Sequence, residues 1–277
     1  MYKIIKKVEL SSGVKLFVME ARLISRKCLP GQFVILRIDE DGERVPLTIA
    51  DFDREAGTIT LIFQEVGDTT RQLGTLNEGD SILDLAGPLG TATEIENFGT
   101  VVCVGGGIGV APLYPIARAY KQAGNKVISI IGARNADLLI LEQEMAAVSD
   151  ELIITTDDGS KGRKGLVIHP LEEILASQKI ERVMAVGPVI MMKSVAAVTK
   201  PHGVHTLVSL NPIMVDGTGM CGGCRVSVGN KNKFACVDGP EFDGHEVDFD
   251  GLMARQRMYH DYERRSKKCG GECSCHG

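Results

Sequence analysis

The pattern of hydrophobic and polar residues changes character near residue 98. Before that point, short runs rich in β-branched and aromatic residues alternate with turn-forming segments such as SSG, DEDGE and NEGD. The runs KLFVMEA, GQFVILRI, GTITLIFQE and DSILDLAG predict strands at 15–21, 31–38, 57–65 and 80–87. No convincing helical period interrupts them. Their even spacing predicts a small antiparallel β-barrel over residues 1–97.

Residues 98–210 alternate instead between compact apolar runs and amphipathic stretches. The strand-like TVVCVGGG at 100–107 is followed by a helix-like segment at 110–124, and the alternation continues to HTLVSL at 205–210. This βαβα order predicts a doubly wound domain, a parallel sheet with helices on both faces. The stretch 97–117 carries no charge, but its glycines and prolines favour a strand, a turn and a helix over a membrane span.

The last segment, 211–277, breaks the alternation with glycine and cysteine. Six of the eight cysteines lie beyond residue 220. A helix-like stretch follows at 249–268, and then a tail with Cys269, Cys273 and Cys275, to which we assign no function. The amino terminus lacks the apolar core of a signal peptide, so we expect a soluble cytoplasmic protein. In a reducing compartment, clustered cysteines indicate a metal site or catalysis more than disulfides.

Within this segment, Asp216 is followed at spacings of x4, x2 and x11 by Cys221, Cys224 and Cys236. Plant-type [2Fe–2S] proteins bind their cluster through C-x4-C-x2-C and a distant fourth cysteine, and here aspartate occupies the first position. Neighbouring glycines let the backbone wrap closely around a cluster. A zinc site is the first alternative and ordinary packing of buried thiols the next. A redox dithiol is a further alternative, but the βαβ start that would support it is absent.

Composition narrows the classes of partner. The formal net charge is −5 and the chain has no tryptophan, so neither charge nor aromatic content supports nucleic-acid binding. Nothing in the sequence predicts a membrane span.

Two weaker signals in the barrel segment are groups of residues whose chemistry suits the binding of a flavin. The first is Arg44, Pro46, Leu47 and Thr48, where an arginine fork suits a diphosphate and a threonine hydroxyl suits a ring nitrogen. The second is Gly67, Thr69 and Thr70, small or hydroxylated residues that can hold another part of the same ligand.

A stronger signal follows the first strand of the α/β segment, where four glycines open a helix. Bare amides at a helix N-terminus suit a diphosphate, and these glycines are Gly105, Gly106, Gly107 and Gly109. The acidic residue usual after the next strand is missing, and Arg134 stands there, which leaves NAD versus NADP open. Asp157, Gly187 and Pro188 end two further strands, where ligands of open α/β sheets bind.

Together these motifs resemble the ferredoxin-NADP reductase superfamily, over nearly the whole chain to about residue 250. RVPLT looks like its flavin motif, R-x-P-[FLY]-[ST], and GGGIGVAP looks like its pyridine-nucleotide loop. The cysteine module is similar to that of the dihydroorotate dehydrogenase electron-transfer subunit. It looks closer still to the small subunits of NADH-dependent reduced ferredoxin:NADP+ oxidoreductases, also described as sulfide dehydrogenase beta subunits. Asp216 in place of the first cysteine favours the second branch.

The resemblance implies a set of cofactors and their binding residues. FAD would be held by the residues around Arg44 and Gly67, and NAD(H), or NADP(H), by the glycine loop with the later strand ends. A [2Fe–2S] cluster would be held by Asp216, Cys221, Cys224 and Cys236.

The resemblance also implies a function. The chain would move electrons between NAD(H), FAD and the cluster for a larger iron–sulfur flavoprotein subunit, and through that partner to or from ferredoxin. The alternatives are an electron-transfer subunit of an NAD-dependent dihydroorotate dehydrogenase, a non-catalytic flavin and cluster redox sensor, and a zinc-containing binding module.

Overall fold

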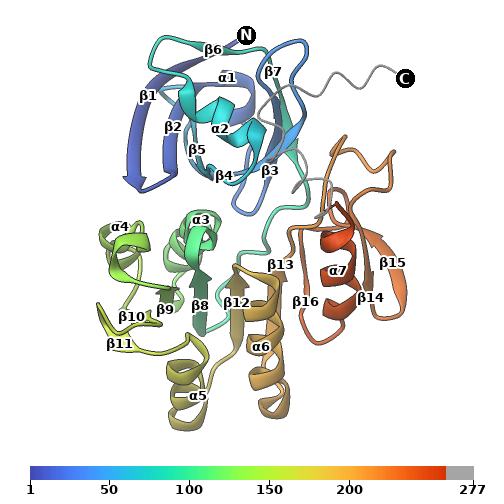
Figure 1. Cartoon of the computed structure of the whole chain (residues 1–277). Coiled ribbons are helices and arrows are strands. Elements are labelled where there is room, and N and C mark those ends of the chain that lie inside the picture. The colour runs from blue at the N-terminus through green and yellow to red at the C-terminus, as the bar shows by residue number, and fades with distance from the viewer. Residues whose placement is uncertain (260–277) are drawn as a thin grey trace.

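The computed structural model describes residues 1–259, which form a barrel, an α/β domain and a smaller module beside it (Figure 1). The strands predicted in the first two regions are present. The second half of the helix predicted at 249–268 and the tail cysteines lie outside the described residues.

The first region is a nearly closed antiparallel sheet in the order β6-β1-β2-β5-β4-β3-β7. Its edge strands, β6 and β7, are separated in sequence only by Leu83, so the sheet curls back on itself. Side chains that point inward fill the barrel, with Phe17 and Phe63 in edge-to-face contact at its centre. Its strands are β1 (Tyr2–Ser11), β2 (Val14–Glu20), β3 (Phe33–Arg37), β4 (Val45–Asp53), β5 (Thr58–Gln64), β6 (Ser81–Ile82) and β7 (Asp84–Leu89).

Two short helices interrupt the barrel where the sequence showed no helical period: α1 (Arg22–Ser25) and α2 (Asp68–Thr75). α2 has the sequence DTTRQLGT and buries little beyond Leu73, so it leaves no apolar stripe for a periodicity argument to detect. Side-chain hydrogen bonds support it at both ends. The Thr70 hydroxyl accepts from the Gly67 amide at 3.0 Å, and Lys7 Nζ donates to the Gly74 and Leu76 carbonyls.

The second region is a sheet in the order β11-β10-β9-β8-β12-β13-β16, parallel except for β16. Alternate residues of its central strands face opposite layers: Val101 and Cys103 pack under α3, while Val102 and Val104 share a core with α5 and α6. The doubly wound prediction is therefore confirmed. The parallel strands are β8 (Thr100–Gly106), β9 (Lys126–Ala133), β10 (Glu151–Thr156), β11 (Arg163–Lys164), β12 (Arg182–Val186) and β13 (His205–Ser209).

The helices of this region are α3 (Val110–Gln122), α4 (Glu142–Ala147), α5 (Ile168–Ser177) and α6 (Val189–Thr199), with one-turn 3-10 segments at η1 (Gly107–Gly109), η2 (Ala136–Leu138) and η3 (Lys200–His202). The apolar run at 137–148 forms η2 and α4 rather than a single helix. Leu141 interrupts it with a left-handed backbone, φ +56°, which a continuous helix cannot contain.

The third module begins as a loop and then forms a hairpin, an edge strand and a helix. These are β14 (Arg225–Val228), β15 (Lys231–Phe234), β16 (Glu241–Asp243), α7 (Phe249–Gln256) and the 3-10 turn η4 (Arg257–Tyr259). β16 pairs antiparallel with β13, Val208 opposite Phe242, and so completes the sheet of the second region. The α/β domain and the third module consequently share one hydrophobic core.

The connection from the barrel to β8 is tied to the third module. Thr91 donates from its amide to the Gly239 carbonyl at 2.6 Å, and the Thr93 hydroxyl donates to Glu241 Oε1 at 2.5 Å. Burial raises the pKa of Glu241 to about 7, against the lowering effects of Thr93 and Arg182. No helix of the described residues is long and apolar enough to cross a membrane.

This carboxyl predicts a pH-dependent stability. Since the folded protein holds the Glu241 proton more tightly than the unfolded chain, stability should fall as pH rises from about 4.5 to about 7. Glu241→Gln should remove this fall and, at pH 8, raise the free energy of unfolding by about 2 kcal/mol, less than the full linkage value because the side chain is partly exposed. Urea titrations at pH 5 and pH 8 measure the difference. Glu246→Gln, an exposed change in the same module, is the control, and an equal pH response in both variants contradicts the expectation.

Candidate functional site

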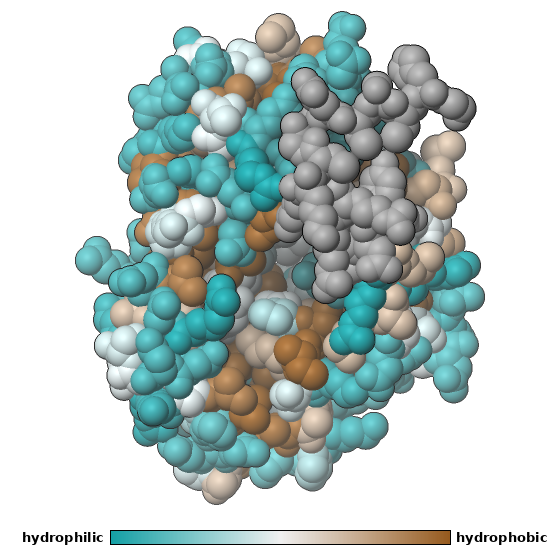
Figure 2. Space-filling model, viewed as in Figure 1, coloured by the Kyte–Doolittle hydropathy of each residue, from teal (hydrophilic) through white to brown (hydrophobic). Residues whose placement is uncertain are grey.

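A cavity of about 850 Å³ lies where the barrel, the α/β domain and the start of the third module meet. The barrel contributes residues of β4 and β5, and the α/β domain contributes the carboxyl ends of β8 and β12. These two strands are the point where the strand order reverses, as in other doubly wound folds that bind ligands there. Apolar residues gather on this face over the α/β domain (Figure 2). The volume suits a dinucleotide-sized ligand.

Most of the predicted nucleotide-binding residues line this cavity. They come from six separate segments of the chain and converge only in the fold. Those in the lining are Pro46, Leu47, Thr48, Thr70, Gly106, Gly107, Gly109, Arg134, Asp157, Gly187 and Pro188.

Arg44, Gly67, Thr69 and Gly105 lie outside the lining. Gly105 is the penultimate residue of β8 and is buried. The other three stand together at one edge, because the Thr69 hydroxyl donates to Glu43 Oε2 at 2.6 Å. This hydrogen bond brings the turn before β4 to the N-terminus of α2. The exposed Arg44 side chain and the amides of α2 are therefore placed on the same rim.

The glycine turn between β8 and α3 contains two glycines with different physical requirements. A Cβ on Gly109 would overlap the Val186 carbonyl oxygen at the end of β12, so the turn can approach β12 only without a side chain. Gly107 has φ +55°, a left-handed conformation, and a Cβ there would meet nothing within 4 Å. Gly109 thus serves close packing, and Gly107 shapes the open side of the turn.

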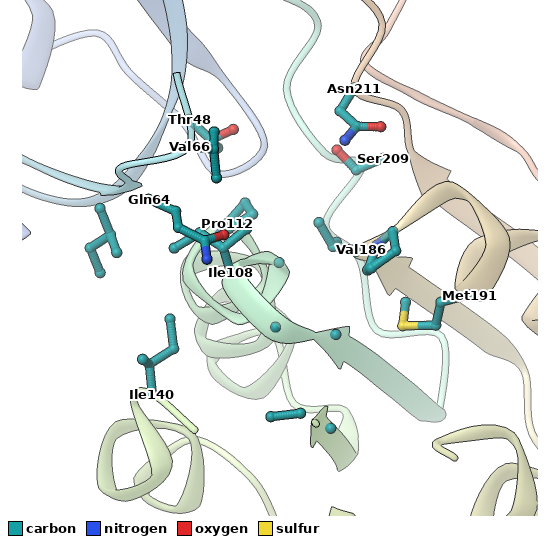
Figure 3. Close-up of a pocket in the computed structure, with 18 of the residues that line it drawn as sticks. Thr48, Gln64, Val66, Ile108, Pro112, Ile140, Val186, Met191, Ser209 and Asn211 are labelled. Carbon is teal, nitrogen blue, oxygen red and sulfur yellow. The ribbon is translucent and has the colours of Figure 1, made fainter. Parts of the chain in front are cut away.

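Several lining residues carry no motif and were missed from the sequence. Gln64 ends β5 and Val66 lies just beyond it, and Figure 3 shows the Gln64 side chain extending toward Ile108 and Pro112. Ser209 and Asn211 lie across the cavity from them. The only sequence signal for Ser209 was its place at the end of a predicted parallel strand.

The predicted cluster loop begins immediately after this wall. Cys224 and Cys236 are buried, and their sulfur atoms lie 3.2 Å apart, well beyond the disulfide bond length of about 2.05 Å. Burial, with the neighbouring Cys224 thiol, raises the pKa of Cys236 to about 12. Two thiolates this close repel each other unless a cation lies between or beside them, so the pair suits a metal better than free thiolates.

The other two predicted ligands are on the same loop but are less buried than this pair. Cys221 is exposed, and the Gly223 amide donates to its sulfur at 3.4 Å. Asp216 accepts hydrogen bonds from the amides of Thr218 at 2.9 Å and Cys221 at 2.8 Å. These bonds, that of Thr218 first, lower the pKa of Asp216 and keep it a carboxylate.

The loop closes through glycines in left-handed conformations, Gly217, Gly219 and Gly222 among them. A Cβ on Gly217 would lie 2.7 Å from Ile35 and 2.8 Å from Leu89, so the loop packs directly on the barrel wall. Within residues 1–259, no three cysteine, histidine or carboxylate side chains form a closed metal cage. The donor set nevertheless fits a cluster: one buried thiol pair, one exposed thiol and one carboxylate on a single wrapped loop.

Two protein families match segments of the chain. Residues 103–197 match the oxidoreductase NAD-binding domain. Residues 211–248 match the iron-sulfur cluster binding domain of dihydroorotate dehydrogenase B. The second match spans all four predicted cluster ligands.

Whole-chain relatives agree with these matches. A dihydroorotate dehydrogenase B (NAD(+)) electron transfer subunit homolog of Thermotoga maritima is 49% identical over 95% of this chain and 93% of its own. A probable electron transfer subunit of the same enzyme from Methanopyrus kandleri is 36% identical over 79% of this chain and 80% of its own.

Solved structures extend the comparison to the fold. A chain from the structure of the NADH-dependent reduced ferredoxin-NADP oxidoreductase, reported for its insights into flavin-based electron bifurcation, is 48% identical, covers 97% of both chains and has a TM-score of 0.92. Phthalate dioxygenase reductase, at 16% identity and a TM-score of 0.61, shares the fold alone. This chain belongs to the family of electron transfer subunits that includes those of dihydroorotate dehydrogenase B, and it is an oxidoreductase subunit with NAD-binding and iron–sulfur domains on a ferredoxin reductase fold.

Proposed function

We propose that this chain is the FAD- and [2Fe–2S]-containing small subunit of a ferredoxin:NADP+ oxidoreductase of the NADH-dependent kind. One observation carries the proposal: the likeness to a chain of such an oxidoreductase extends over 97% of both chains, cluster module included. Asp216 at the first ligand position supports the same branch.

In this proposal the barrel side of the cavity holds the flavin. Pro46, Leu47 and Thr48 line that wall, and Arg44 with the N-terminus of α2 supplies positive charge for a diphosphate at the rim. The apolar walls exclude water from the ring. Bound FAD would accept a hydride from NADH and pass single electrons toward the cluster.

The α/β side of the cavity receives NAD(H) in the same proposal. Gly106 and Gly107 of the turn line the cavity, and Gly187 and Pro188 line it at the neighbouring strand end. Arg134 and Asp157 line the cavity just beyond the ends of β9 and β10, and in such folds a residue after the second strand recognises the ribose and its 2′ position. No side chain has to act as acid or base, so these residues bind and orient.

The iron–sulfur ligands in this proposal are Asp216, Cys221, Cys224 and Cys236. Supporting this assignment, the buried thiol pair lies in the core behind the cavity, and Met214 belongs to both the core and the cavity lining. A larger iron–sulfur flavoprotein subunit would take the electrons, and ferredoxin would act through that partner.

A second candidate is the electron-transfer subunit of an NAD-dependent dihydroorotate dehydrogenase, favoured by the family match over residues 211–248. Anaerobic purification of the native complex separates the two. A partner with its own iron–sulfur clusters supports the first, and a barrel dehydrogenase supports the second.

The same preparation tests the electron-transfer activity itself. We expect bound flavin and iron, rapid bleaching of the flavin by NADH, and reduction of artificial acceptors by the chain alone. A flavin that NADH bleaches slowly or not at all points instead to a redox sensor, and a colourless zinc-containing chain contradicts the proposal.

The role of Asp216 can be tested separately. Asp216→Cys should keep the cluster, since a thiolate replaces a carboxylate donor, and should shift its reduction potential. Asp216→Ala should lose most of the iron. Iron analysis and EPR of the reduced protein measure both, with Glu246→Ala, the loss of an exposed carboxylate in the same module, as control. Unchanged iron and EPR in Asp216→Ala would mean that the carboxylate only caps the loop amides.

A further inference from the structure

The last turn of α7 makes hydrogen bonds to two functional segments of the chain. Arg255 Nη2 donates to the Gly223 carbonyl at 3.2 Å. Gln256 Nε2 donates to the Asn211 carbonyl at 2.9 Å and to Asn211 Oδ1 at 3.3 Å. Neighbouring side chains of one helix thus contact the cluster loop and the segment that enters it.

The two contacted residues have distinct positions. Gly223 lies between Cys221 and Cys224. The Arg255 guanidinium therefore binds a backbone carbonyl in the short segment that joins two proposed ligands. Asn211 lines the cavity, and Figure 3 shows it beside Ser209 on the wall opposite Thr48.

The helix is itself firmly held. Phe249 and Leu252 are buried in the same core as Cys224 and Cys236. The Asp248 side chain caps the first turn by accepting from the Gly251 amide at 2.9 Å. Its neighbour in Figure 1 is α6, to which Asp250 is joined by an ion pair with Lys193 at 2.7 Å. Because α7 is held in this way, its side chains have little freedom and can fix the positions of the residues they contact.

The charge of Arg255 adds a second effect. The guanidinium carries a positive charge, and it is partly buried, where its field is screened less than in water. A cluster gains one negative charge on reduction. A fixed positive charge next to the loop therefore favours the reduced state and raises the reduction potential.

We propose that Arg255 and Gln256 are positioning residues, through which α7 sets the cluster loop and the cavity wall relative to each other. Arg255 also holds the cluster's reduction potential up, while Gln256 fixes Asn211 for the bound nucleotide or flavin. This inference rests on the proposed function, in which the loop carries the cluster.

The test replaces Arg255 in the complete chain, purified anaerobically, and measures iron content, the EPR signal and the midpoint potential. Arg255→Met should lower the equilibrium constant for reduction of the cluster about tenfold. For one electron this is a fall of about 59 mV in the midpoint potential. Loss of iron to a chelator should be about tenfold faster, the lower end of the effect of outer-shell partners. Arg257→Met removes the same charge from an exposed position two residues on and should change neither value.

A conservative variant keeps the test decisive if Arg255→Met fails to fold. Arg255→Lys retains the charge and one donor. Its equilibrium constant for reduction of the cluster should therefore lie within a fewfold of the wild-type value. The inference is overturned if the midpoint potential falls as far in Arg257→Met as in the Arg255 variants. It is also overturned if Arg255→Met leaves both the midpoint potential and the rate of iron loss to the chelator unchanged.

Gln256→Met tests the other contact. It should change the KM for NADH or the rate of flavin bleaching while leaving the cluster potential at the wild-type value. Unchanged flavin kinetics remove Gln256 from the inference. A wild-type chain without any iron–sulfur signal defeats the proposed function instead, so the two failures are distinguishable.

Discussion

Cys224→Ala should yield a chain that still binds flavin but has lost its iron. Cys224 is 1% exposed, and its sulfur lies 3.2 Å from that of Cys236, so no other donor of the loop can take its place in the core. The remaining three donors cannot complete the four-ligand set of a [2Fe–2S] cluster. Iron per chain should fall nearly to zero, and the EPR signal of the reduced protein should vanish.

The matched control is Cys28→Ala. Cys28 is a fully buried thiol in the barrel core, so its removal creates a similar small cavity, costing on the order of 1 kcal/mol, without touching the loop. This variant should retain iron, flavin and NADH bleaching. Equal iron contents in the two variants would show that Cys224 is a packing residue.

The second large effect is expected in the glycine turn. Gly109→Ala forces a methyl group against the backbone of Val186 and Gly187, neither of which is a flexible side chain that could turn away. We expect a loss of about 3 kcal/mol or more in the free energy of unfolding, at the upper end of overpacking effects. The midpoint of thermal unfolding should fall by about 6 to 12 °C in a chain of this size.

Gly107→Ala provides the comparison, because its methyl group would enter open space at the cost of a left-handed conformation, about 1 to 2 kcal/mol. Its main effect should be weaker NADH binding, measured as a higher KM for flavin bleaching, with a small loss of thermal stability. In Gly109→Ala the main effect should be the loss of thermal stability. If both variants melt alike, the packing role assigned to Gly109 is wrong.

The doubly wound domain was predictable because its strands are buried on both faces and read as continuous apolar runs. The cysteine spacing was equally informative, since few structures besides a metal loop need such a pattern. In contrast, α2 has polar side chains on most of its surface, and hydrogen bonds from the distant Lys7 support its C-terminal end. A contact between residues so far apart in sequence leaves no local pattern.

The cavity itself was only partly predictable. Gly106 and Thr48 belong to motifs, whereas Gln64 and Asn211 reach the cavity only because the barrel and the third module are placed against the α/β domain. The attachment of β16 to β13 depends on three residue pairs, and a strand that short carries no periodicity of its own. Sequence reasoning finds residues that share a motif and misses those that share only a location.

The pairing of β16 with β13 has a practical consequence for anyone who divides this chain. A fragment ending at residue 210 would uncover the outer edge of β13 and the apolar surface that Phe242 covers, and an open edge of that kind recruits other copies of itself. Excised nucleotide domains should therefore aggregate, whereas a barrel-less fragment from residue 98 onward retains a finished sheet. In domain rearrangements, the nucleotide and iron–sulfur parts should travel as one inherited unit.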